Sequence, residues 1–367
     1  MEHRIKRIHL DLTNRCNLNC SYCYVVREKS SMCHEKAEMT SKEWLGIIDQ
    51  AVEMGIGSFV VSGGEPLSFP GILEIMERLG SHHAKASLMT NLWKTDGKVM
   101  ESVIESPAVK EIITSLDGFD GHNIARPPSD WHNIINVIRW IREKRKDCRI
   151  SVNTVLHRHN MGEVVDLQRK VVELGVDAWR VDLPIRPHKI DILLDFKTAV
   201  EIASRLIINR YAHAELQKTE LALFRIYKSQ LENIQLGDAA AQSDTSLHPC
   251  DYFLGSITVK PDGTITLCSP IQLVLGRITE GTSLSDVLGS AMKNNFFTLK
   301  VSDLEGCRNC KYLMLCGGGC RADALRWTGG GKQCRSNLMF HNASCGRNDS
   351  THSFQQSEGN LQRVDKK

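Results

Sequence analysis

Six segments with the pattern of a short β-strand, each followed by helical periodicity, occupy the first half of this chain. The predicted strands are apolar and bounded by turn residues, and they cover residues 5–12, 58–61, 85–89, 111–116, 149–156 and 178–183. Thr40-Ser41-Lys42-Glu43 has the pattern of a capping box, and Asp130 can cap a long helix carrying Trp131. Strands that alternate with helices favour a parallel sheet with right-handed crossovers. The sequence therefore predicts an α/β fold.

Polar residues follow every one of these strands. The first strand runs into a cysteine loop, and the others are followed by Gly63-Gly64-Glu65-Pro66, Thr90-Asn91, Ser115 with Asp117, Asn153-Thr154, and Arg180 with Asp182. The carboxyl ends of parallel strands meet at one edge, which is where barrels and open sheets bind ligands. We therefore expect one large polar ligand to lie across this edge.

The 13 cysteines of the 367-residue chain fall into two groups. Three lie within residues 16–23, eight follow residue 249, and Cys148 is the only one between Cys33 and Cys250. No apolar run is long enough to span a membrane, and the first residues lack the apolar core of a secretory signal. A cytoplasmic location is therefore expected. Disulfides are rare there, so thiols at this density are interpreted as metal ligands or catalysts.

The charge balance excludes some partners. Lys and Arg number 46 against 43 Asp and Glu, which gives a formal net charge of +3. Such a balance predicts no nucleic-acid partner and no polybasic contact with a membrane. The length favours roughly two domains.

Cys16, Cys20 and Cys23 form a CxxxCxxC pattern on one predicted loop. A cluster of four irons takes one thiolate per iron, so three thiolates leave one iron open to another ligand. Together with the Gly-Gly-Glu-Pro turn after the second strand, this loop resembles the signature of the radical S-adenosylmethionine (radical SAM) enzymes. The resemblance covers about residues 5–183 and implies a partial (β/α)6 TIM-like barrel. It also implies that SAM chelates the open iron and is cleaved to a 5′-deoxyadenosyl radical, which abstracts hydrogen from the substrate.

The same resemblance implies the residues that contact SAM. Glu65 would accept a hydrogen bond from the methionine ammonium, and Tyr22 would shield the cluster beside the adenine. Gly63 and Gly64 would let the backbone approach the ligand closely. The complete set of expected SAM contacts is Tyr22, Gly63, Gly64, Glu65, Pro66, Asn91, Ser115, Asp117 and Asn153. Ser115 and Asp117 match the strand end that contacts the ribose.

A zinc site is the alternative at the cysteine loop. Zinc prefers four closed ligands, and the nearest further donors are Cys33 and His34. Under that alternative, Glu65 is an ordinary turn residue and Asp117 a helix-capping carboxylate.

The later cysteines match a second pattern. Their spacing resembles that of the SPASM domain, a small α+β cysteine-rich domain that holds two auxiliary [4Fe–4S] clusters. By that resemblance the outer cluster is held by Cys307, Cys310, Cys316 and Cys334. The inner cluster is held by Cys250, Cys268 and Cys320. Three [4Fe–4S] clusters are thus expected in the chain.

The inner cluster lacks a fourth ligand in this pattern. It either has an open iron or takes a ligand from Cys33, Cys148 or Cys345. A zinc ribbon is the alternative reading, because Cys345 raises the number of thiols to eight, enough for two zinc ions.

These patterns suggest four parts. Residues 1–195 form the barrel, and 196–245 a helical linker with one helical run over about 214–236. Residues 246–345 form the SPASM domain, in which Pro261-Asp262-Gly263 predicts a hairpin, and residues 346–367 form a tail predicted to be disordered.

The resemblance implies a radical SAM oxidoreductase that matures a peptide or protein, with the auxiliary clusters aiding electron transfer. Formylglycine formation is disfavoured because Ser269 stands where such enzymes carry an Asp. The first strand starts within ten residues of Met1, which leaves no room for a leader-peptide domain. Either the precursor binds the barrel directly, or a separate leader-binding protein delivers it, or the substrate is small. An electron donor such as flavodoxin or ferredoxin is an expected partner. The alternatives are a dehydrogenase or epimerase of a small metabolite such as an aminocyclitol, and a non-catalytic zinc scaffold.

No catalytic acid or base is assigned. The candidates for proton transfer or for binding a substrate carboxylate are His157, His159, Arg180, Asp182 and Arg186, and for each of them a solvated loop position is an equally good interpretation. Arg126, before Pro127-Pro128 on the loop after the fourth strand, is a candidate for contact with the substrate.

Overall fold

The computed structural model describes residues 5–25, 38–94, 96–185, 191–223, 255–271, 273–279, 281–291, 295–304 and 321. Its strands are β1 (Arg7–Asp11), β2 (Ser58–Ser62), β3 (Lys85–Met89), β4 (Val109–Ser115), β5 (Arg149–Val155), β6 (Ala178–Asp182), β7 (Glu220–Leu223), β8 (Ser256–Val259), β9 (Thr264–Thr266) and β10 (Val274–Arg277). Its α-helices are α2 (Ser41–Glu53), α3 (Ile72–Ser81), α4 (Gly97–Glu105), α5 (Asp120–Ala125), α6 (Trp131–Lys144), α7 (Val164–Glu173), α8 (Phe196–Ala212) and α10 (Leu284–Ala291). The predicted tail lies outside the described residues.

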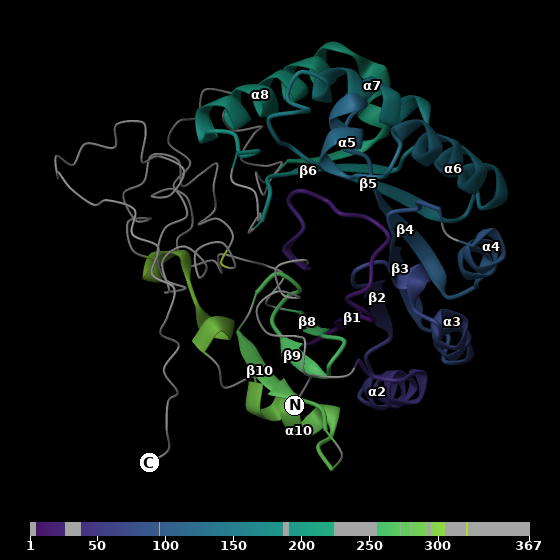
Figure 1. Ribbon diagram of the computed structural model, residues 1–367. Helices are drawn as coiled ribbons and strands as arrows, with labels where there is room; N and C mark the ends of the chain where they lie inside the picture. The colour runs from purple at the N-terminus through teal and green to yellow at the C-terminus, as the bar shows by residue number, and fades with distance from the viewer. Residues whose placement is uncertain are drawn as a thin grey trace.

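All of these strands belong to one sheet, in the order β10-β9-β8-β1-β2-β3-β4-β5-β6-β7. The strands from β1 to β7 pair in parallel, each with the next in the chain. Figure 1 shows the sheet curved, with the helices in an arc on its outer side and the first loop on its inner side. The predicted partial barrel of alternating strands and helices is therefore confirmed, and each of its predicted strands is present.

The sheet extends beyond the predicted unit at both ends. At one end, residues 220–223 form β7 and pair with β6, so the prediction of a helix over 214–236 is wrong at this point. At the other end, β8 pairs in parallel with β1 and in antiparallel with β9, which confirms the predicted hairpin. The hairpin thus continues the barrel sheet. The division of the chain into parts stays a prediction.

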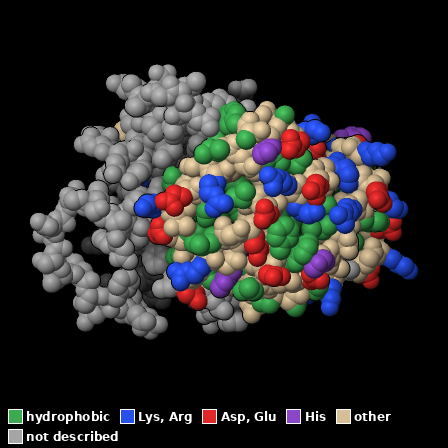
Figure 2. Space-filling view, turned by 90° about the horizontal axis from the view of Figure 1, so that it is seen from above, with side chains coloured by type: hydrophobic (Ala, Val, Ile, Leu, Met, Phe, Trp, Pro, Cys, Tyr) green, Lys and Arg blue, Asp and Glu red, His purple; other side chains and the backbone are tan. Residues whose placement is uncertain are grey.

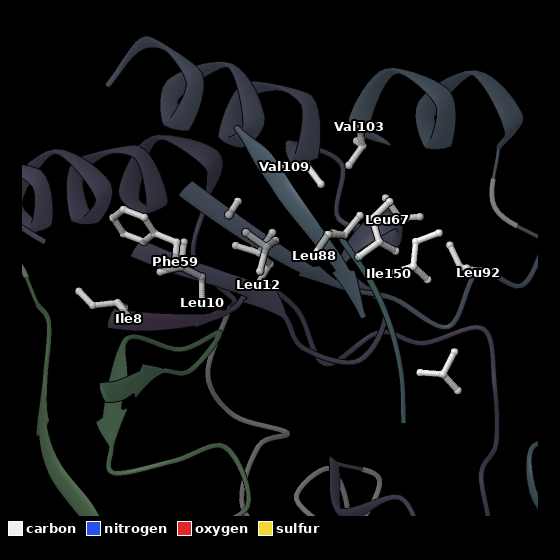
Figure 3. Packing of buried hydrophobic residues seen from close by; sticks show 14 of the residues in the cluster. Ile8, Leu10, Leu12, Phe59, Leu67, Leu88, Leu92, Val103, Val109 and Ile150 are labelled. Carbon is white, nitrogen blue, oxygen red and sulfur yellow. The ribbon is translucent and has the colours of Figure 1, made fainter. Parts of the chain in front are cut away.

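The main core lies between the sheet and its outer helices. Ile8, Leu10 and Leu12 have no exposed surface and lie beside Phe59 of β2 in Figure 3. Since successive strand residues point to opposite faces, Asp11 points to the inner face of the sheet. The predicted capping box at Thr40 and the predicted cap at Asp130 are both formed. These caps fix where the helices begin relative to the strand edges.

The surface agrees with the balanced charge. On the face shown in Figure 2, Lys and Arg are interspersed with Asp and Glu, without a large patch of one sign. Among the described residues no helix is both long enough and apolar enough to cross a membrane.

The pairing of β8 with β1 predicts that the hairpin and the barrel unfold together. Ile257 on β8 is fully buried and lies in register with Ile8. Ile257→Ala should cost about 2–5 kcal/mol and lower the thermal midpoint, read from tryptophan fluorescence, by several degrees. Val274→Ala, at a 58% exposed position on β10, should change stability by no more than about 0.5 kcal/mol. An unchanged tryptophan transition in Ile257→Ala would mean that the hairpin is independent of the barrel.

Candidate functional site

The loop that carries Cys16, Cys20 and Cys23 follows β1 directly and is mostly irregular. Its first part is hydrogen-bonded to the turn after β2: Gly64 N donates to Thr13 O at 2.6 Å, and Glu65 N donates to Arg15 O at 2.8 Å. An irregular loop forms no helix or sheet ladder, so its buried backbone N–H and C=O groups need hydrogen-bond partners from adjacent segments. The turn after β2 therefore sets the path of the chain into Cys16.

The second part of the loop is held by the segment after α5. Asn19 N donates to Pro127 O and Ser21 N to Ala125 O, each at 2.8 Å. These two bonds lie on either side of Cys20, which is 8% exposed. The loop is thus clamped between the ends of two elements that lie far apart in the sequence.

The two glycines of the turn are needed for this close approach to protein backbone. A Cβ on Gly64 would lie 2.3 Å from Arg15 O, and one on Gly63 would lie 2.5 Å from Thr13 O. Gly63 also has a φ of +132°, which disfavours any side chain. In the structure these glycines admit the cysteine loop, and the close approach of a ligand that the sequence suggested stays a prediction.

Glu65 is fully buried, and its carboxylate is held by three donors. Oε1 accepts from Thr90 Oγ1 at 2.7 Å and from Leu67 N at 3.1 Å, and Oε2 accepts from Asn91 N at 2.8 Å. Burial raises the pKa of Glu65, and these hydrogen bonds act in the opposite direction. A carboxylate offers about four lone-pair positions, so one acceptor position is left for a further donor.

Asn91, at the end of β3, reaches the loop itself. Its Nδ2 donates to Asn17 Oδ1 at 2.8 Å and lies 3.7 Å from Cys16 Sγ. The same sulfur accepts from Leu18 N at 3.4 Å. Hydrogen bonds to ligand sulfurs tune the potential of an iron–sulfur cluster, so the surroundings of Cys16 suit a metal-bound thiolate.

Asp117, just beyond β4, is fully buried, and both oxygens of its carboxylate accept hydrogen bonds from other residues. Its Oδ1 accepts from Val155 N at 2.9 Å, and its Oδ2 accepts a short hydrogen bond from the Tyr22 hydroxyl. Arg126 Nη1 donates to the same hydroxyl at 2.6 Å and lies 3.8 Å from Asp117 Oδ2. Tyr22, Asp117 and Arg126 thus form one buried network.

Ser115 and Asn153 lie opposite each other in the register of β4 and β5, and both are half-buried. Part of the surface of Ser115 and of Asn153 is exposed to solvent, whereas Asp117 is fully buried. Glu65 and Asn91, which follow β2 and β3, are joined directly by the hydrogen bond from Asn91 N to Glu65 Oε2.

Arg126 is a site residue whose role the sequence did not reveal. It was a candidate for substrate contact, but the structure buries it to 8% exposure. The only signal was its position before Pro127-Pro128 on a loop at the ligand edge. The helix α5 that precedes it was not predicted at all.

The other candidates for acid–base work differ in accessibility. His157 is fully buried, packs 5.9 Å from the Tyr22 ring, and has no hydrogen-bond partner at Nε2 within the described part of the chain. Arg180 and Asp182 form a half-exposed ion pair at 3.0 Å on β6, and His159 is exposed. Arg186 lies outside the described residues.

Ser269, the residue after Cys268, contacts the end of β1. Ser269 Oγ donates to Asp11 Oδ1 at 3.2 Å, and Lys260 Nζ lies 3.4 Å from Asp11 Oδ2. Asp11 ends β1, so a buried polar contact links the start of the first cysteine loop to the residue after Cys268. The remaining predicted ligands Cys250, Cys307, Cys310, Cys316, Cys320 and Cys334 lie outside the described residues.

The loop offers three cysteine thiols. A [4Fe–4S] cluster takes one thiolate per iron, so three thiols suit a cluster that keeps one iron open, whereas zinc takes four closed ligands. Among the described residues no group of three His, Cys, Asp or Glu side chains is arranged as ligands of one ion. Burial raises the pKa of the Cys16 thiol, and it raises the pKa of the Cys20 thiol to about 11, while the Arg126 charge acts to lower both. The loop therefore offers thiols that a cluster would deprotonate.

Comparison with known proteins identifies the class. Residues 10–171 match the Radical SAM superfamily, so the chain contains a radical SAM domain, the domain of the radical SAM enzymes. The individual relatives that it resembles have named activities. It is 25% identical to an AdoMet-dependent heme synthase from Methanosarcina barkeri, over 90% of this chain and 95% of that protein. It is 27% identical to a PqqA peptide cyclase from Streptomyces rochei, over 87% and 85%.

Two solved structures share the fold. One is SuiB from Streptococcus suis bound to S-adenosylmethionine, with a TM-score of 0.66 and 15% identity over 90% of this chain and 74% of that chain. The other is anSMEcpe with bound AdoMet, with a TM-score of 0.67 and 20% identity over 91% and 95%. At these identities the likeness concerns the fold.

The close contact at Gly64 makes a direct prediction. Gly64→Ala should push Arg15 away and loosen the loop, with a loss of about 1–3 kcal/mol in stability. Cys16 in the reduced, cluster-free protein should then react faster with iodoacetamide, as measured by mass spectrometry. Gly46→Ala on α2, where a Cβ meets nothing within 4 Å, is the control and should leave the rate unchanged. Equal rates in Gly64→Ala and the unmodified chain would show that the turn does not set the loop.

His122 predicts a pH dependence of stability. Its Nδ1 accepts from Asp117 N at 3.2 Å, and burial lowers its pKa to about 4 from 6.5. Below pH 6.5 the unfolded chain takes up a proton that folded His122 does not, so stability falls as the pH drops from 6.5 to 4. By pH 5 the loss from this residue is about 2 kcal/mol.

The test compares thermal midpoints between pH 7 and pH 5. His122→Gln should be less stable at pH 7 but should lose less on acidification than the unmodified chain. His132→Gln, at an exposed position, should keep the original dependence. An identical dependence in all three proteins would contradict the assignment.

Proposed function

We propose that this protein is a radical SAM oxidoreductase that abstracts hydrogen from a peptide or protein substrate. The observation that carries the proposal is the clamped loop of three cysteines beside a buried glutamate, at the ligand edge of a radical SAM domain. When bound, a [4Fe–4S] cluster supplies the electron that cleaves SAM to a 5′-deoxyadenosyl radical.

Under this proposal each residue of the loop has one task. Cys16, Cys20 and Cys23 bind three irons and leave the fourth for SAM. The free acceptor position of Glu65 takes the methionine ammonium, while Thr90 and Asn91 hold its carboxylate in place.

The ribose and adenine contacts fall to the neighbouring strand ends. Ser115 and Asn153 keep exposed surface and can donate hydrogen bonds to the ligand. The carboxylate of Asp117 is already occupied by Tyr22 and Val155, so it acts on the ligand through the position of Tyr22. Gly63 and Gly64 admit the cysteine loop, and Pro66 begins a short 3-10 helix, Pro66–Ser68, directly after Glu65.

Two auxiliary clusters are part of the proposal. Cys268 and the six predicted C-terminal ligands would hold them, and the Asp11 contact with Ser269 supports a position near the SAM site. Cys148 precedes the first residue of β5, so it lies at the opposite edge of the parallel sheet and is ill placed to complete the inner cluster. Cys33 and Cys345 stay candidates for that ligand.

The substrate class rests on the relatives. PqqA peptide cyclases recur among them, and SuiB has been solved bound to its precursor peptide SuiA. A peptide substrate, an electron donor such as flavodoxin or ferredoxin, and a separate leader-binding protein follow as proposed partners. The match to a heme synthase over 95% of its length makes a tetrapyrrole the second candidate substrate.

The first test is the cluster and its chemistry. The protein purified anaerobically should contain iron and sulfide, and after reduction it should convert SAM to 5′-deoxyadenosine. Cys16→Ala, Cys20→Ala and Cys23→Ala should each abolish this conversion, whereas Cys148→Ala, which changes a buried thiol away from the site, should retain it. A colourless protein that contains only zinc would contradict the proposal.

The second test separates the auxiliary domain and the substrate. Cys268→Ala should lose part of the iron and all product but still cleave SAM. Deuterium from a labelled substrate should appear in 5′-deoxyadenosine only when the correct substrate is supplied. Transfer from a deuterated tetrapyrrole, with none from candidate peptides, would replace the peptide proposal by the second candidate.

A further inference from the structure

Within the described residues, the guanidinium of Arg126 is the buried cation that contacts Tyr22 and Asp117. It donates to the Tyr22 hydroxyl at 2.6 Å, lies 3.8 Å from Asp117 Oδ2, and its carbon centre is 5.8 Å from the Tyr22 ring. Its Nε has no hydrogen-bond partner within the described part of the chain. Burying a charge is costly unless it serves a partner, so this position needs an explanation.

The backbone around Arg126 is as closely engaged as its side chain. Ala125 O and Pro127 O accept the bonds from Ser21 N and Asn19 N. Arg126 thus stands between the two hydrogen bonds that flank Cys20, with its side chain against Tyr22, the second residue after that cysteine. A change in the side chain is transmitted directly to the position of the loop.

Arg126 also brings a positive charge to the cysteine loop. It is 8% exposed, and its Nη1 lies 2.6 Å from the hydroxyl of Tyr22, a residue between Cys20 and Cys23. Reduction of a cluster adds a negative charge, which a nearby buried cation stabilises.

We propose that Arg126 is a positioning residue of the cluster site that holds the Cys20 loop through Tyr22 and favours the reduced state of the cluster by its charge. The proposal rests on the proposed function, because it requires a cluster at Cys16, Cys20 and Cys23. Arg126 does not touch the substrate under this assignment.

The test compares Arg126→Gln and Arg126→Lys with the control Arg158→Gln, which removes a charge from an exposed position at the same sheet edge. The midpoint potential of the cluster is measured by an EPR-monitored titration without SAM or substrate. Arg126→Gln should shift the reduction equilibrium by about tenfold toward the oxidised state, which is about 59 mV for one electron. Arg126→Lys should keep the potential, and so should Arg158→Gln.

A second readout uses the reduced, cluster-free proteins. Alkylation of Cys20 should be faster in Arg126→Lys, which keeps the positive charge but does not reproduce the planar guanidinium, and unchanged in Arg158→Gln. The alkylation rate of Cys20 can be measured even in a variant that fails to assemble a cluster.

The outcomes separate the two proposals. An unchanged potential in Arg126→Gln, or unchanged alkylation in Arg126→Lys, overturns the role of Arg126 and leaves the proposed function intact. Absence of any cluster from the unmodified chain overturns the proposed function itself.

Discussion

The backbone hydrogen bonds between the turn after β2 and the chain entering Cys16 are the contact on which the site depends. Gly64 and Glu65 donate to the carbonyls of Thr13 and Arg15, and they can do so only because Gly63 and Gly64 carry no side chain. A mostly irregular loop has no hydrogen-bond ladder of its own. Its shape is therefore imposed by strand ends that the parallel sheet brings to one edge.

Two carboxylates, those of Glu65 and Asp117, are buried at this edge near the thiols. Each accepts hydrogen bonds from residues of a neighbouring strand end. Glu65 accepts a hydrogen bond from the backbone N–H of Asn91, just after β3. Asp117, just after β4, accepts one from the backbone N–H of Val155 at the end of β5. Arg126 places a positive charge 3.8 Å from the Asp117 carboxylate. A preorganised site of this kind needs little reorganisation when a charged ligand binds.

Much of this fold could be predicted from local patterns. Apolar runs, the capping box at Thr40 and the Pro261-Asp262-Gly263 turn act within a few residues, so the sequence specifies them directly. The strand β7 could not be foreseen, because Glu220–Leu223 consists of good helix formers and becomes a strand only by pairing with β6.

Spacing and resemblance name the motif residues Cys16 and Glu65 as site residues, but they do not reveal the contacts that these residues make. The burial of Arg126 and the hydrogen bond between Tyr22 and Asp117 depend on residues about a hundred positions apart, which no local pattern encodes. The packing of Gly64 against the backbone of Arg15 likewise leaves no trace in composition.

Under the proposed function, the clamped loop by itself holds a cluster with an iron open to SAM. EPR tests this on a full-length variant in which alanine replaces all of the predicted auxiliary ligands, Cys250, Cys268, Cys307, Cys310, Cys316, Cys320 and Cys334. We expect about four irons per chain and a reduced signal that changes when SAM is added. A folded variant that binds no iron, or a signal that SAM leaves unchanged, would contradict it.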